Sequence, residues 1–187
     1  MPEMRQCRGK AGDLTLFGEA AVEQLLETLN PDPFYRDDAH YMERALAQAR
    51  RAASVGEVPV GAVLVRDGSV VAEAHNLVET TPDALDHAEM LVLREGARST
   101  HSWRLDGMTL YVTLEPCPMC SGAMALTRIA RLVYGTPDPR KGAVDSVYDV
   151  LRHPANNHRV EVSSGLLSEP SARLLRDFFA GRRSRPA

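Results

Sequence analysis

Two short motifs in this chain carry residue types that bind metal ions and move protons. The first is His87-Ala88-Glu89, and the second is Pro116-Cys117-Pro118-Met119-Cys120. Zinc accepts thiolate and imidazole ligands, and the spacing of Cys117 and Cys120 places both side chains on one face of a helix. Near a helix N-terminus the macrodipole favours thiolate over thiol. Together the motifs predict one zinc ion (Zn2+) per chain, bound by His87, Cys117 and Cys120.

Three protein ligands leave one position of a tetrahedral zinc ion open, which is typical of catalytic sites and not of structural ones. Two thiolates offset the charge of the ion, so a nearby base is needed to take a proton from water at the open position. Glu89 lies two residues beyond His87, in the first turn of the same predicted helix. We therefore predict that Glu89 is the catalytic acid–base and does not ligate the metal.

Each motif alone is weaker evidence than the pair. A lone CxxC is more often a redox or structural motif, and a lone His-x-Glu has no specific meaning. The pair, separated by a strand and with each motif opening a helix, matches the known His-x-Glu and Pro-Cys-x-x-Cys signature of zinc-dependent nucleobase deaminases. Two alternatives stay open: a deaminase of a free base such as guanine or cytosine, and a zinc-stabilised binding module without activity.

The hydrophobic pattern predicts the elements that position these motifs. A helix that opens at a capping Asp37 or Asp38 precedes two strands, which are joined by a hairpin at Arg66-Asp67-Gly68. Alternating strands and helices follow, and this order predicts a mixed sheet with helices on both faces. The strands are expected over 58–65, 70–74, 108–114, 129–134 and 159–163, and the later helices over 86–98, 116–126, 146–152 and 170–180.

The composition excludes several classes of protein. The 187 residues are 44% hydrophobic and 25% charged with a formal net charge of −3, which argues against a disordered chain. The 3 cysteines cannot form a disulfide framework. The chain shows neither a stretch near the ~18 apolar residues of a membrane helix nor a signal peptide. We therefore expect a cytoplasmic protein with no membrane partner.

Beyond the two motifs, the chain resembles the bacterial tRNA-specific adenosine deaminases over nearly all of residues 38–182. The resemblance includes the segments 57–65, 110–117 and 157–161. It implies a three-layer α/β/α cytidine-deaminase-like fold with a mixed five-stranded sheet, and a homodimer with active sites near the interface. It also implies hydrolytic deamination of adenosine to inosine at the wobble position of a tRNA anticodon stem-loop.

The same resemblance extends to residues that would contact the RNA. Asn76 takes the place of an asparagine that reads the flipped purine, and Asp138 that of an acid near the neighbouring nucleotide. One segment departs from the pattern, because the family commonly has Asp-Pro-Thr-Ala where this chain has Asp83-Ala84-Leu85-Asp86. We expect Asp86 to cap the following helix. The alternative is that its charge lies near the zinc ion and alters substrate choice.

The N-terminal residues are expected to lie outside the main domain. Residues 1–37 are predicted to form an N-terminal extension with one short helix over 17–30 and a linker at Pro31-Asp32-Pro33, whereas residues 38–187 form the zinc-dependent deaminase domain. The extension is expected to be an accessory segment, and a partner-docking helix is the alternative.

Basic and aromatic residues near the C-terminus are candidates for RNA contacts. Arginines crowd the last fifteen residues, where they either hold RNA phosphates or complement a helix dipole. They are Arg173, Arg176, Arg182, Arg183 and Arg185. We expect Trp103 and the Phe178-Phe179 pair to pack in the core or at an interface rather than to stack on bases.

Overall fold

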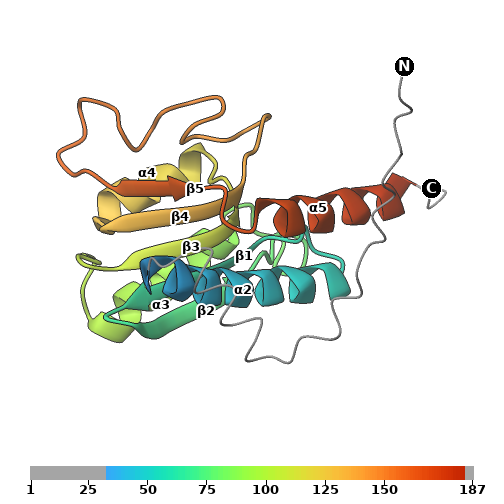
Figure 1. Ribbon diagram of the computed structural model, residues 1–187, viewed down its shortest axis with the longest axis horizontal. Coiled ribbons are helices and arrows are strands. Elements are labelled where there is room, and N and C mark those ends of the chain that lie inside the picture. Colours follow the sequence, from blue (N-terminus) through green and yellow to red (C-terminus); the bar gives the residue numbers. More distant parts are fainter. Residues whose placement is uncertain (1–32, 184–187) are drawn as a thin grey trace, which may run out of the picture. The chain divides into compact units, whose positions relative to one another are not determined.

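The computed structural model describes residues 33–183, which contain a mixed sheet of five strands in the order β2-β1-β3-β4-β5 (Figure 1). The antiparallel half comprises β1 (Gly61–Arg66), β2 (Ser69–His75) and β3 (Thr109–Leu114), with β1 between the other two. The other half is parallel, because β4 (Arg131–Thr136) pairs with β3 and with β5 (Glu161–Ser164). The predicted mixed five-stranded sheet and the hairpin before β2 are confirmed.

Within the described residues, helices cover both faces of this sheet. They are α2 (Pro33–Ser54), α3 (Ala88–Thr100), α4 (Pro118–Thr127) and α5 (Ser168–Arg183). Alternate strand residues point to opposite faces, so Leu64, Leu110 and Leu132 share a core with α3 and α4. Their neighbours Val63 and Val133 pack instead with α2. The predicted α/β/α layering is therefore observed, and no described helix is long and apolar enough to cross a membrane.

Helix α2 begins at Pro33, four residues before the predicted start at Asp37. Proline is well tolerated in the first turn of a helix, so Pro33, the last residue of the predicted linker, is also the first residue of the helix. The predicted cap at Asp37 or Asp38 is wrong, because both residues lie inside the helix. The buried carboxylate of Asp38 accepts hydrogen bonds from Tyr111 Oη at 2.7 Å and from both terminal nitrogens of Arg131, at 2.8 and 2.7 Å. Asp38 thus joins α2 to β3 and β4.

The loop between β4 and β5 also differs from the prediction. Residues 146–152 form turns and not the predicted helix. The carboxylate of Glu115 accepts hydrogen bonds from three successive amides at and just before the start of this segment, those of Val144, Asp145 and Ser146. This distant carboxylate competes with local helical hydrogen bonding and sets the path of the loop. The predicted helix over 17–30 lies outside the described residues, and the division at residue 37 stays a prediction.

The first strand also starts later than predicted, at Gly61 and not at residue 58. Gly61 is where α2 crosses β1, and a Cβ there would lie 2.1 Å from the carbonyl oxygen of Ala45. Only glycine allows this close approach of the two backbones. The preceding residues Val58 and Val60 line a pocket at the end of the sheet.

Candidate active site

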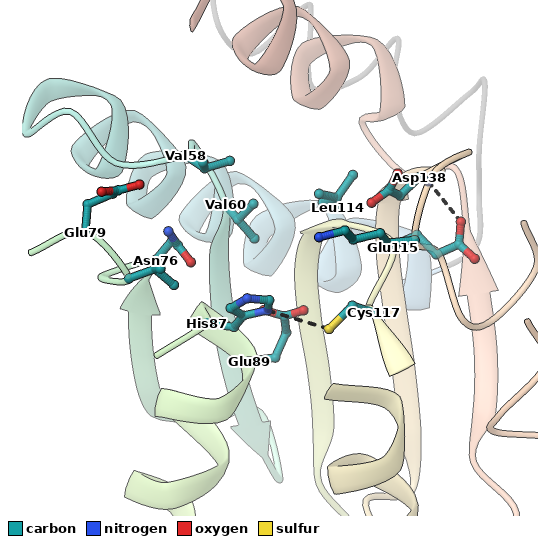
Figure 2. Close-up of a pocket in the computed structure, with 12 residues that line it drawn as sticks. Val58, Val60, Asn76, Glu79, His87, Glu89, Leu114, Glu115, Cys117 and Asp138 are labelled. Carbon is teal, nitrogen blue, oxygen red and sulfur yellow. Dashed lines mark hydrogen bonds between the residues drawn. The ribbon is translucent and has the colours of Figure 1, made fainter. Parts of the chain in front are cut away.

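Three side chains of the two motifs meet where α3 and α4 begin (Figure 2). His87 is the N-cap residue of α3, Cys117 is that of α4, and Cys120 follows in the first turn of α4. The Cys117 sulfur lies 3.6 Å from His87 Nδ1 and 3.7 Å from the Cys120 sulfur, which itself lies 3.5 Å from His87 Nδ1. The structure therefore brings together the three predicted metal ligands.

These separations fit a zinc ion. Tetrahedral bonds of the usual zinc–sulfur and zinc–nitrogen lengths place two sulfurs about 3.8 Å apart and a sulfur and a nitrogen about 3.6 Å apart. Each measured separation agrees to within a few tenths of an ångström. In the part of the chain that the structure describes, no other group of three His, Cys, Asp or Glu side chains has metal-binding geometry.

The charges of the three side chains also suit a cation. The hydrogen bond from the Cys120 thiol, aided by His87, lowers the pKa of Cys117 to about 4. The same hydrogen bond and burial raise the pKa of Cys120, so its thiol proton stays on. A metal cation replaces such a proton when it binds. The donor set therefore has the right charge and geometry for zinc.

Glu89 lies beside this triad without belonging to it. Its carboxyl is in the first turn of α3 and only 4% exposed, and burial raises its pKa. Figure 2 shows Glu89 next to His87 at the base of the pocket. This is the position predicted for a group that moves protons and does not hold the metal.

The pocket above the triad has a volume of about 210 Å³. Asn76 and Asp138 both line it, so the two residues assigned by resemblance lie in the same cavity as His87, Glu89 and Cys117. Figure 2 shows them on opposite sides, Asn76 from the end of β2 and Asp138 from the loop after β4. The other lining residues are Val58, Val60, Val78, Glu79, Leu114, Glu115 and Lys141.

Glu57 is a residue of the site that sequence reasoning missed. Its fully buried carboxylate accepts hydrogen bonds from Asn76 Nδ2 at 2.9 Å and from the Thr80 amide at 2.6 Å. Burial alone would raise the pKa of Glu57, but these hydrogen bonds outweigh it and lower the pKa. Because an ionised carboxylate only accepts, it fixes the Asn76 amide and leaves its Oδ1 for a ligand.

Glu115 plays the corresponding part on the opposite wall. Besides the three amides after Ala143, it accepts a hydrogen bond from the Asp138 amide at 2.9 Å. These hydrogen bonds lower the pKa of Glu115 against the opposing effect of burial. Both missed residues are carboxylates next to apolar, strand-forming segments, and this placement was the available signal. They hold the two walls of the pocket in place.

The predicted cap at Asp86 is wrong. His87 is the N-cap residue of α3, and no side chain caps that end. The Asp86 carboxylate instead accepts hydrogen bonds from Arg94 Nη1 at 2.8 Å and from Thr81 Oγ1 at 2.9 Å. Asp86 therefore pairs with Arg94, more than two helical turns along the chain, instead of capping the amides at the start of α3.

The C-terminal arginines have intramolecular partners. Arg173 and Arg176 lie 3.9 and 2.6 Å from the carboxylate of Glu169, and Arg182 donates to the Gly56 carbonyl oxygen at 2.7 Å. Arg185 lies outside the described residues. The contacts of Arg173 and Arg176 lie within α5, whereas that of Arg182 reaches the segment after α2. A role in holding phosphates stays a prediction.

The three aromatic residues singled out in the sequence, Trp103, Phe178 and Phe179, do not occupy the core. Trp103 is 62% exposed and Phe179 is 43% exposed, while Phe178 is half-buried with its ring packed edge-on against Phe179. Core packing is therefore wrong for these side chains, and packing at an interface stays a prediction.

Comparison with known proteins places this site among deaminases. The model of the MafB19-like deaminase family matches residues 36–183. The tRNA-specific adenosine deaminase of Bacillus subtilis is 47% identical over 142 residues, which are 76% of this chain and 88% of that protein.

Solved structures agree with this similarity. One comes from a study of A-to-I editing by tRNA:A34 deaminases at the wobble position of transfer RNA. This structure matches with a TM-score of 0.71 and 46% sequence identity, over 73% of this chain and 99% of the chain in that structure. The guanine deaminase from Nitrosomonas europaea has a TM-score of 0.67 and 21% identity, and covers 76% of this chain and 84% of its own. That second likeness shows the shared fold alone.

Proposed function

The chain belongs to the family of bacterial tRNA-specific adenosine deaminases, and we propose that it hydrolyses adenosine to inosine at the wobble position of a tRNA anticodon, with release of ammonia. One observation carries the proposal. The ligand atoms of His87, Cys117 and Cys120 lie at separations that suit a zinc ion. The buried Glu89 lies beside them, at the base of a pocket lined by Asn76. A binding module without activity has no use for this carboxyl.

We propose that His87, Cys117 and Cys120 hold one zinc ion, which when bound supplies the Lewis acidity that activates water. Glu89 takes one proton from a water molecule as the water oxygen forms a bond to C6 of adenine, and passes that proton to the ring nitrogen. Glu89 then moves the second proton of the water, now on the C6 hydroxyl, to the departing amino group, so that the C6–N bond breaks, the C6 carbonyl forms and ammonia leaves. Water and adenosine are consumed, and inosine and ammonia are formed.

We propose a tRNA substrate because the target base must leave its stack to enter a pocket. A nucleotide in an anticodon loop unstacks more readily than a paired one. The relatives with high identity are named for tRNA, whereas the likeness to a guanine deaminase is limited to the fold. A homodimer acting in the cytoplasm is part of the proposal.

Incubation of the zinc-loaded chain with a panel of tRNA transcripts tests this function. We expect sequencing to find inosine at the wobble adenosine of at least one transcript, with one ammonia released per inosine. Free adenine, guanine and cytosine form the parallel arm. Ammonia from a free base, with no inosine in any tRNA, would contradict the proposal.

Replacing Asn76 with alanine is expected to raise the KM for an anticodon stem-loop about tenfold, because an edge of the base loses its hydrogen-bond partner. Metal content should not change, since Asn76 contacts Glu57 and not the triad. Steady-state kinetics with elemental analysis measures both quantities. The exposed Asn157 supplies a matched control, Asn157→Ala. Equal KM values for the two variants would show that Asn76 does not read the base.

A further inference from the structure

The loop between β2 and α3 forms part of one wall of the pocket. Val78 and Glu79 line the pocket from this loop. Figure 2 shows Glu79 on the same side of the pocket as Asn76. The loop ends at Asp86, directly before the metal-site residue His87. Any group that holds the loop against α3 therefore sets the shape of the pocket mouth.

Backbone hydrogen bonds close the loop at its base and in two turns. The Leu77 amide donates to the Asp86 carbonyl oxygen at 3.0 Å, and the Thr81 amide donates to the Leu77 carbonyl oxygen at 2.9 Å. The Asp86 amide donates to the Asp83 carbonyl oxygen at 3.1 Å. None of these three contacts involves a residue of α3. On the side of β1, the Thr80 amide is held by Glu57.

The Asp86 carboxylate supplies the missing connection to α3. One of its oxygens lies 2.9 Å from Thr81 Oγ1 in the middle of the loop, whose single proton it shares with the Leu77 carbonyl oxygen at 2.8 Å. The other oxygen accepts a hydrogen bond from Arg94 Nη1 on the helix at 2.8 Å. The Asp86 side chain is 13% exposed and that of Arg94 is 39% exposed, so the contact is partly shielded from water. A shielded hydrogen-bonded ion pair restrains its neighbours more than an exposed one.

A second ion pair on α3 is more exposed than the Asp86–Arg94 pair. The side chains of Arg98 and Glu95 are 3.7 Å apart and are 76% and 55% exposed. Such a pair contributes little to stability. It also joins residues of one helix, whereas the Asp86–Arg94 pair joins the helix to the loop.

We propose that Asp86 and Arg94 are positioning residues that clamp the β2–α3 loop, and that they set the affinity of the pocket for the RNA around the target nucleotide. The proposal rests on the proposed function. The clamp acts through Val78 and Glu79, which line the pocket. Among the described residues, the Asp86 carboxylate bonds to Thr81 and Arg94 and to no side chain of the triad or Glu89. It is therefore expected to control substrate binding and not the deamination step.

Two single variants test the clamp with the zinc-loaded full chain and an anticodon stem-loop. Asp86→Ala removes the carboxylate, and Arg94→Met removes the cation while keeping much of the side-chain length. Each is expected to raise KM about tenfold, the effect of losing a hydrogen bond to a charged group, with kcat within about twofold of the wild-type value. The control Glu95→Gln removes the exposed pair and should leave both constants unchanged.

The double variant and a conservative variant separate positioning from general loss of structure. If the two residues act as one clamp, Asp86→Ala combined with Arg94→Met raises KM no more than either single change. Arg94→Lys keeps a cation and should recover part of the affinity. Wild-type KM in both single variants, or a fall in kcat together with zinc content, would overturn the proposal.

Hydrogen exchange gives a readout that needs no activity. The amides of Leu77 and Thr81 are expected to exchange at least about tenfold faster in both single variants than in wild type, while those within α3 stay protected. Unchanged exchange in the loop would overturn the clamp. If the wild-type chain deaminated no tRNA, the proposed function would fail, but this measurement would still decide whether Asp86 and Arg94 hold the loop.

Discussion

The Glu89→Gln variant is expected to keep its fold and its zinc, while its deamination rate falls about 100- to 10,000-fold. This factor is the usual contribution of a positioned acid–base. Glutamine has nearly the shape of glutamate, so it fills the same buried position. It can neither take a proton from water nor return one to the leaving amino group. The expected result is therefore a separation of metal content from rate.

Single-turnover kinetics on an anticodon stem-loop measures the rate, and elemental analysis of the same sample measures the zinc. Glu95→Gln is the matched control, because it changes an exposed glutamate of the same helix. A joint fall in zinc and rate would identify Glu89 as a ligand or as a residue needed for folding. An unchanged rate would assign the proton transfers to another group.

The elements that could be predicted from the sequence are those whose signals are local. The turn at Asp67 and Gly68 has positive φ at both residues, 49° and 73°, which suits the glycine in the pattern. The metal ligands follow from spacing at two helix starts, since the N-cap residue and the first turn of each helix direct side chains to the same end. Alternation along β3 and β4 likewise predicts which residues enter each core.

Three of the errors share one physical cause, which is a carboxylate with a distant partner. Asp38 and Asp86 both precede or begin predicted helices, where local rules assign them to capping. The fold offers each of them an arginine instead, Arg131 for Asp38 and Arg94 for Asp86. An arginine pairs with a carboxylate more strongly than a backbone amide does.

Glu115 shows the same effect on a larger scale. Its carboxylate gathers backbone amides about thirty residues further along the chain, and this arrangement replaces the helix predicted over 146–152. The pattern of that segment contains no sign of a buried acceptor elsewhere. Partners so far apart in the chain become visible only once the sheet is assembled.

Cys117→Ala is expected to lose bound zinc and, with it, about 1,000-fold or more of the activity, since Lewis acidity contributes several kcal/mol to such reactions. The remaining pair, Cys120 and His87, is too small a donor set for a tetrahedral zinc site. Wild type should contain one zinc ion per chain, and the variant far less, by elemental analysis. Zinc should also raise the Tm of wild type and not that of the variant, because only a bound ion stabilises the folded state.

Cys7→Ala is the control for this change, because Cys7 belongs to neither motif. It should match wild type in zinc content, in the Tm increase with zinc and in rate. Full zinc occupancy in Cys117→Ala would remove that sulfur from the site. Undiminished deamination by metal-free wild type would contradict the Lewis-acid role itself, because the activation of water would then fall to Glu89 and the pocket alone.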